Sequence, residues 1–240
     1  MRIVRVAIVL VFASAALEAL EVARLFEAFA QGAAQVLRIE LPAGNIRILE
    51  SRDRSVDAEL VLNCVGQICP CREVAERIQF GSAGFEDIQL LTLDLPDSYE
   101  KRVESFRTNG LTSIADTKWG RPTTEVKQRG RGKRTGWKLS ANLQVSLPSY
   151  ERLEVALGDG NLILEHLQGS VRIRVHSGSV QLGARRSAVG SIEVEVKNGR
   201  ARLSGAGPGD IAGKKIHWQG PGHDALEIEV VRGSVVVALD

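Results

Sequence analysis

The sequence predicts an all-β protein: a β-solenoid-like stack of short strands with glycine turns, preceded by an N-terminal signal or amphipathic helix. The first observation is an alternation of apolar and polar residues. In SVRIRVHSGSVQLG, Ser170 to Gly183, the side chains of Val171, Ile173 and Val175 point one way. Such alternation is typical of strands with one buried face. The second observation is abundant glycine, 24 residues, with only 5% aromatic residues, which suits thin layers and tight turns.

Length and charge set the outer limits of this prediction. A chain of 240 residues can form one or two domains with a proper core. A formal net charge of +2 gives no strong expectation of nucleic-acid binding. We expect three parts: a leader at 1–30, a β-rich part at 36–138 that holds a cysteine segment and a basic loop, and a β-repeat domain at 139–240.

The N-terminus has the order of a secretory signal peptide. Arg2 and Arg5 form a basic region, Val6 to Ala16 form an apolar region, and Ala13-Ser14-Ala15 is a small-residue cleavage site. The apolar run is too short to span a bilayer. We therefore expect export to the periplasm or cell envelope, and the alternative is an ordinary N-terminal helix of a cytosolic protein.

A second small-residue site, Ala28-Phe29-Ala30, leaves the cleavage point open. Leu17, Leu20, Leu25 and Phe29 lie near helical spacing. Cleavage after Ala15 would therefore leave an amphipathic helix in the mature chain, whereas cleavage after Ala30 would remove it.

The three cysteines lie together in CVGQICPC, as Cys64, Cys69 and Cys71. In an exported protein this spacing favours one local disulfide, from Cys64 to Cys69 or Cys71, with one thiol left over that could pair between chains. A structural zinc site would need a fourth ligand, and none stands nearby in the sequence.

The part before residue 139 is less regular than the repeat domain. Two short alternating runs flank Pro42–Asn45, and further strands are expected at Asp57–Cys64 and Ile88–Leu95, with a helical turn at Arg72–Ile78. The stretch 118–138 is basic and carries Trp119 and Trp137 near its ends. We interpret it as a solvated loop because of its glycines. The alternative is a binding arm, for which anionic lipid or polysaccharide is a better partner than nucleic acid in an exported protein.

One turn motif recurs along the repeat domain. Its copies are DGNL, SGSV, NGRA and RGSV, with turn glycines Gly160, Gly178, Gly199 and Gly233, and Gly44 is an earlier copy. The spacings between the four glycines are 18, 21 and 34 residues. Periods near twenty residues favour stacked β-rungs. The alternative is a set of β-hairpins, since Asn198-Gly199 is a strong hairpin signal.

These residues carry a family resemblance. The segments LPSYERLEVALGDGNLILEHLQGSVRIRVHSGSVQL and GSIEVEVKNGRARLSG resemble the DUF4097-type putative adhesin family of β-strand-repeat envelope proteins. The resemblance covers Leu139 to Asp240, with a weaker echo from Val36 to Leu62. It implies a solenoid-like fold and an envelope location, and it brings no catalytic residues. The chain departs from the family pattern in CVGQICPC and in the basic stretch.

Catalytic motifs are absent from the sequence. There is no Gly-x-Ser-x-Gly elbow, no P-loop and no dinucleotide-binding glycine pattern. Arg172, Arg174 and His176 are predicted to share an exposed polar strand face. Glu193 and Glu195, two apart on one strand face, have a spacing that could serve glycoside chemistry, but a solvated strand edge explains them as well.

The remaining histidines give one metal hypothesis. His217, His223 and Asp224 are competent ligands, yet no strand or helix spacing brings them together. We therefore expect no metal and no cofactor.

These observations predict a non-catalytic exported protein that serves adhesion, binding or scaffolding, with an envelope protein or a polysaccharide as partner. Two alternatives remain. One is an envelope enzyme acting on glycans, which two Tyr and three Trp disfavour because sugar sites usually need aromatic platforms. The other is a regulatory partner of another envelope protein.

Overall fold

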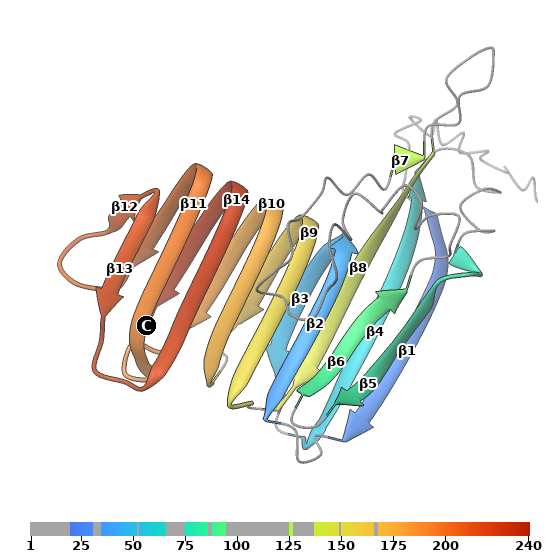
Figure 1. Ribbon diagram of the computed structural model, residues 1–240, viewed down its shortest axis with the longest axis horizontal. Coiled ribbons are helices and arrows are strands. Elements are labelled where there is room, and N and C mark those ends of the chain that lie inside the picture. The colour runs from blue at the N-terminus through green and yellow to red at the C-terminus, as the bar shows by residue number, and fades with distance from the viewer. Residues whose placement is uncertain are drawn as a thin grey trace, which may run out of the picture.

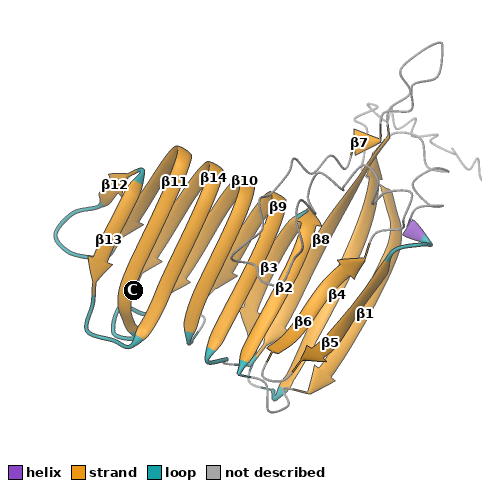
Figure 2. Cartoon of the chain, in the orientation of Figure 1, coloured by secondary structure: helices purple, strands orange, loops and turns teal. Residues whose placement is uncertain are grey.

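The computed structural model describes residues 20–30, 35–51, 53–65, 75–85, 88–94, 125–126, 137–148, 150–165 and 168–240. Nearly all of them are in β-strands (Figure 2), apart from loops and a single helical turn in which Ile78 N–H donates to Ala75 O at 3.2 Å. The strands are β1 Leu20–Ala30, β2 Val36–Ala43, β3 Asn45–Glu50, β4 Ser55–Val65, β5 Gln79–Phe85, β6 Ile88–Asp94, β7 Glu125–Val126, β8 Trp137–Leu147, β9 Arg152–Glu165, β10 Ser170–Ala184, β11 Val189–Ser204, β12 Ile211–Gly213, β13 Lys215–Gln219 and β14 Asp224–Leu239.

The strands form one open sheet that folds back on itself. Its main order is β1-β4-β8-β3-β9-β10-β14-β11-β12, with β13 on β11, β2 between β6 and β9, and β5 on β6. The ribbons of β9, β10, β14 and β11 run up one layer, curve over and return in a second layer behind (Figure 1). We call the half of each strand before its bend the first layer, together with β2, β5, β6 and β13. The halves after the bend, with β1, β3, β4, β8 and β12, form the second layer.

The long strands are parallel and in register. β10 pairs with β9 on one side and with β14 on the other, and β14 pairs with β11. The C-terminal strand therefore lies between the strands that contain Gly178 and Gly199, so the order in space differs from the order in the chain. The Asn198-Gly199 pair makes no hairpin, because β11 continues through it as one strand alongside β14.

The bend in each long strand occurs at its glycine. Gly178 has a φ of +148°, a value that L side chains rarely adopt. A Cβ built on Gly178 would lie 1.6 Å from the carbonyl oxygen of Gly160 on the neighbouring strand. Glycine thus serves both the bend and the close approach of adjacent backbones. The same arrangement recurs along the row, which contains Gly44, Gly160, Gly178, Gly233 and Gly199.

The core lies between the two layers. In β10, Val171, Ile173 and Val175 are buried before the bend, and Val180 and Leu182 are buried after it. The burial pattern changes phase at Gly178, so both halves of the strand direct their aliphatic side chains into the same interior. Side chains of Val, Ile, Leu and Ala on neighbouring strands continue this core along the sheet.

The expected amphipathic helix is wrong over Leu20–Ala30, where the structure has strand β1. This strand pairs antiparallel with β4, and a bulge lies between Glu21 and Ala23. From Ala23 onward every second residue faces the core, as Leu25 and Phe29 do opposite Leu60 and Val56. A strand partner supplies backbone hydrogen bonds and an apolar surface, and this tertiary gain overrides a weak helical spacing. The leader residues before Leu20 lie outside the described residues. Within the described residues, no helix is long and apolar enough to cross a membrane.

Candidate functional site: a charged trough on the first layer

The candidate site lies on the outer face of the first layer, across β10, β14, β11 and β13. Alternation along each strand directs valine and isoleucine inward and charged side chains outward. Parallel and antiparallel pairing then aligns the charged residues in two rows. The first row is Arg172, Glu227, Glu193 and His217, and the second is Arg174, Glu229, Glu195 and Lys215.

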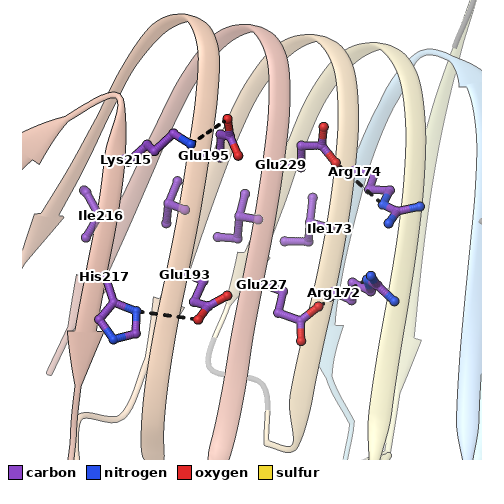
Figure 3. A pocket seen from close by; sticks show the side chains of 12 residues that line it. Arg172, Ile173, Arg174, Glu193, Glu195, Lys215, Ile216, His217, Glu227 and Glu229 are labelled. Atoms are coloured by element: carbon purple, nitrogen blue, oxygen red, sulfur yellow. Dashed lines mark ion pairs between the residues drawn. The ribbon is translucent and has the colours of Figure 1, made fainter. Parts of the chain in front are cut away.

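These eight residues line a shallow open trough of about 400 Å³, which we call the charged trough. Figure 3 shows both rows, with the aliphatic residues between them. Ile173, Ile228, Val194 and Ile216 form this middle row, and their side chains are buried in the core below. The rigid sheet therefore fixes the positions of the charged groups at the spacing of the strands.

Ion pairs join the charged side chains across the strands. The central glutamates stand side by side, Glu227 next to Glu193 and Glu229 next to Glu195, and like charges in such positions repel. Flanking cations offset this repulsion. The pairs are Arg172 Nε–Glu227 Oε2 (3.2 Å), Arg174 Nε–Glu229 Oε2 (3.8 Å), Lys197 Nζ–Glu229 Oε1 (2.9 Å), Lys215 Nζ–Glu195 Oε1 (3.1 Å) and His217 Nδ1–Glu193 Oε1 (3.5 Å).

Electrostatic effects in the trough are moderate because most of its groups are half-exposed. The hydrogen bond to Glu229 raises the pKa of Lys197, with the charge of Glu229 adding to the effect. Three lysine and arginine side chains of the trough, with Lys197 beside it, face its four glutamates, so the surface presents both donors and acceptors and little net charge. Such a surface can recognise a partner by polar complementarity, which gives specificity more than raw affinity.

His176 differs from the sequence-based expectation. It was expected to be solvent-exposed beside Arg172 and Arg174, but only 9% of it is exposed. His176 lies just before the bend, where the alternation of burial along β10 breaks and both Val175 and His176 are buried. The Nη2 group of Arg232 lies 3.1 Å from Nε2 of His176 and donates to it.

The metal hypothesis finds no support in the geometry. His217 contacts Glu193, while Asp224 accepts a hydrogen bond from Gly169 N–H at 3.2 Å. Among the residues that the structure describes, no group of three His, Cys, Asp or Glu side chains could hold a metal ion. Glu193 and Glu195, which were weighed for glycoside chemistry, both lie in the open trough and contact side chains of β13.

Two other predicted features lie largely outside the described residues. Cys64 is 2% exposed on the core face of β4. Cys69 and Cys71 lie outside the described part, so the disulfide stays a prediction. Of the basic stretch 118–138, only Glu125–Val126 of β7 and Trp137–Lys138 of β8 are described.

The sequence reasoning missed a polar ladder on the second layer. Asn142, Asn45, Asn161 and Ser179 lie on four successive strands, β8, β3, β9 and β10. Asn45 Nδ2 donates to Asn142 Oδ1 at 2.8 Å, Asn161 Nδ2 to Asn45 Oδ1 at 3.1 Å, and Ser179 Oγ to Asn161 Oδ1 at 2.6 Å. Three of these residues directly follow a bend glycine, so the position after each turn glycine was the available signal.

An ion pair with a buried carboxylate on the first layer was also missed. Arg38 on β2 donates to Glu154 on β9 through Nε and Nη2, at 3.0 and 2.7 Å. Only 8% of the Glu154 side chain is exposed. No local sequence signal could have found this pair, because 116 residues separate its partners.

Comparisons with known proteins add little to this geometry. No family model and no curated protein matches the chain. Among solved structures, a putative cell adhesion protein from Clostridium sporogenes aligns over 91% of this chain and 99% of its own, with a TM-score of 0.47 and 11% identity. A putative adhesin from Bacteroides fragilis aligns over 90% and 97%, with a TM-score of 0.28 and 10% identity. At these TM-scores the two alignments carry no argument about this protein.

Proposed function

We propose that the protein is a non-catalytic, exported binding or scaffold module of the cell envelope, built on a solenoid-like stack of strands. The charged trough carries this proposal. Its charges are spread over four strands in two rows, and they are tied to one another in ion pairs. This arrangement suits recognition by a surface, in which many groups each contribute a little, and its partner is an envelope protein or a polysaccharide.

Export rests on the order of basic, apolar and small residues from Met1 to Ala15. Of the two cleavage sites, the one after Ala15 keeps strand β1 in the mature protein, whereas cleavage after Ala30 would remove it entirely. Removal would expose the edge of β4 and its buried residues Leu60 and Leu62. We therefore propose that the mature chain starts at Ala16.

The first test is the intact mass of the protein isolated from its native cell, before and after reduction. A mature chain that starts at Ala16 supports export and the proposed cleavage after Ala15. A start at Gln31 supports export but contradicts that cleavage point, and an unprocessed chain contradicts export. A gain of two hydrogens on reduction supports a disulfide in CVGQICPC, and three free thiols contradict it.

The second test measures retention of the purified protein on isolated cell envelopes. We compare Arg172→Ala, Glu227→Ala and the fourfold variant that also changes Arg174 and Glu229 to Ala. An exposed ion pair contributes about 0.2–1 kcal/mol, so each single change should weaken retention by less than about fivefold. The fourfold variant should weaken it by more than tenfold.

The matched control for the fourfold variant is the double variant Arg47→Ala and Glu165→Ala, which removes an exposed ion pair on the other layer. It should retain normal binding. If the fourfold variant binds like the wild type, the trough is not the binding surface. If a single substitution in the trough abolishes the protein's activity while the fold is intact, the result favours an enzyme over a binding surface.

A further inference from the structure

The two ends of the sheet differ in how well their edges are protected. At the end formed by β12 and β13, the edge strands have only three and five residues. Of the two, β13 carries a charged side chain, Lys215, which is 77% exposed. Short, charged edges discourage pairing with another chain.

At the opposite end β1 is longer, and its charged side chains are engaged within the chain, Arg24 with Glu21 and Glu59 and Glu27 with Ser82. In Figure 1, β1 and β5 lie at this end of the sheet. β1 has eleven residues, and among the described strands its only ladder partner is β4. Its second row of backbone N–H and C=O groups therefore faces away from the sheet. A long edge of this kind is a template for another strand.

Apolar side chains at this end are incompletely covered. Phe26 is 68% exposed on the outer face of β1. Leu25 and Phe29 on the inner face, with Phe80 on β5, are only partly buried, whereas the core residues of the neighbouring strand β4 are almost completely buried. The interior thus reaches the surface here, and an added pair of layers would continue it.

We propose that two copies of this chain associate through β1, antiparallel across a two-fold axis at Leu25. In this register Leu25 lies opposite Leu25 of the second copy on the inner face. On the outer face, Phe26 of each copy lies opposite Arg24 of the other, and the flat side of this guanidinium, which Glu21 and Glu59 hold by its edges, can rest on the ring. This inference concerns a different surface from the charged trough and does not depend on it.

The neighbouring registers that keep each residue on its face are less favourable. An axis at Arg24 would place two guanidinium groups directly opposite each other, and like charges in this position repel. An axis at Phe26 would place Leu25 opposite the carboxylate of Glu27. With the axis at Leu25, Glu27 instead faces the small side chain of Ala23, so it can keep its hydrogen bonds to Ser82 N–H and Oγ at 3.3 and 2.7 Å.

The size of the edge is sufficient for a dimer. Eleven residues at about 3.4 Å each give an edge of about 37 Å, and two layers about 10 Å apart with their side chains make it about 20 Å thick. The end of the sheet that each copy would bury in the dimer then measures about 700 Å², close to the roughly 800 Å² that each partner buries in a standard interface.

The test is the molar mass of the purified protein in solution, measured by light scattering over a concentration series. The wild type should have twice the mass of its chain. Phe26→Lys places a cation opposite Arg24 of the other copy, where like charges repel, and should yield a monomer, without a folding cost because Phe26 is already exposed. Val236→Lys changes another exposed apolar side chain, 41% exposed on β14, and should remain a dimer.

A crosslinking pair tests the register. Leu25→Cys places two thiols opposite each other at the axis and should form a covalent dimer on mild oxidation. Phe29→Cys, four residues from the axis, should not crosslink beyond the wild-type level. A monomeric wild type, or a Phe26→Lys variant that stays dimeric, would overturn the proposal. Crosslinking of Phe29→Cys in place of Leu25→Cys would overturn the register.

Discussion

Replacing a bend glycine is the sharpest test of the stacking. We choose Gly178→Ala, because Gly178 lies in the middle of the glycine row. Its φ of +148° would strain an alanine by about 1–3 kcal/mol. The new Cβ would also lie 1.6 Å from Gly160 O, a distance that real Cβ atoms essentially never show, so the backbones of β9 and β10 must move apart. Forcing a group into a packed site costs a further 1–3 kcal/mol or so.

The expected loss in the free energy of unfolding is therefore about 4 kcal/mol, a large part of the roughly 5–15 kcal/mol typical of a folded domain. At about 2–4 °C per kcal/mol for a chain of this size, the melting temperature should fall by about 8–16 °C. Urea denaturation followed by circular dichroism gives the free energy, and a thermal scan gives the midpoint.

Gly207→Ala is the matched control. No atom lies within 4 Å of a Cβ built there, and this glycine has no positive φ. It should change the free energy of unfolding by less than about 0.5 kcal/mol. If Gly178→Ala is equally neutral, the glycine row does not set the spacing of the strands, and the reasoning is refuted.

Three further substitutions test the packing around β2 and β9. Arg38→Ala should lower the free energy of unfolding, measured by urea denaturation, by about 3 kcal/mol because it leaves the Glu154 carboxylate buried and unpaired. Arg47→Ala, which breaks an exposed pair, should lower it by less than about 1 kcal/mol, and equal losses for the two variants would contradict the reasoning. Burial raises the pKa of Glu40 above 4.5, so the folded state binds the proton of this carboxyl more tightly than the unfolded state does. The resulting stabilisation is present below pH 4.5 and is lost as the pH rises through the pKa of the folded state. Glu40→Gln should therefore stabilise the protein more at pH 7 than at pH 4, and an equal effect on the free energy of unfolding at both pH values would refute the assignment. Within the described part of the chain the Tyr150 hydroxyl is buried without a hydrogen-bond partner, and burial raises its pKa to about 12; Tyr150→Phe should raise the free energy of unfolding by about 1 kcal/mol, and a loss of that size would reveal a partner.

Much of the local structure follows from sequence pattern. Alternation predicted the strands from Leu139 onward, because a residue's face in a strand depends only on its parity. The repeated glycines predicted where each strand changes direction. The charged face was also predicted, since Arg172 and Arg174 on one strand, and Glu193 and Glu195 on another, alternate with the apolar residues of that strand.

The sequence-based predictions were wrong or incomplete where a residue's conformation or burial depends on a neighbour that is distant in sequence. Leu20–Ala30 has a helical spacing of leucines, but β4 provides a strand partner, and pairing is worth more than that spacing. His176 has the parity of an exposed residue, yet it is buried at the bend, where it contacts Arg232 of the neighbouring strand β14. The Arg38–Glu154 pair and the Asn142–Asn45–Asn161–Ser179 ladder depend on register between strands, which a single strand does not encode.

The sequence by itself determined that the protein is built of strands, which faces of those strands are apolar, and where glycine must bend them. These are properties of a residue and its close neighbours, set by side-chain alternation and by the conformational freedom of glycine. Only the tertiary structure decided that β14 lies between β10 and β11, which charges form rows, and which of the described strands lie at the ends of the sheet. Such choices come from the packing of whole strands against one another, and any strand with the same alternation would satisfy the local rules equally well.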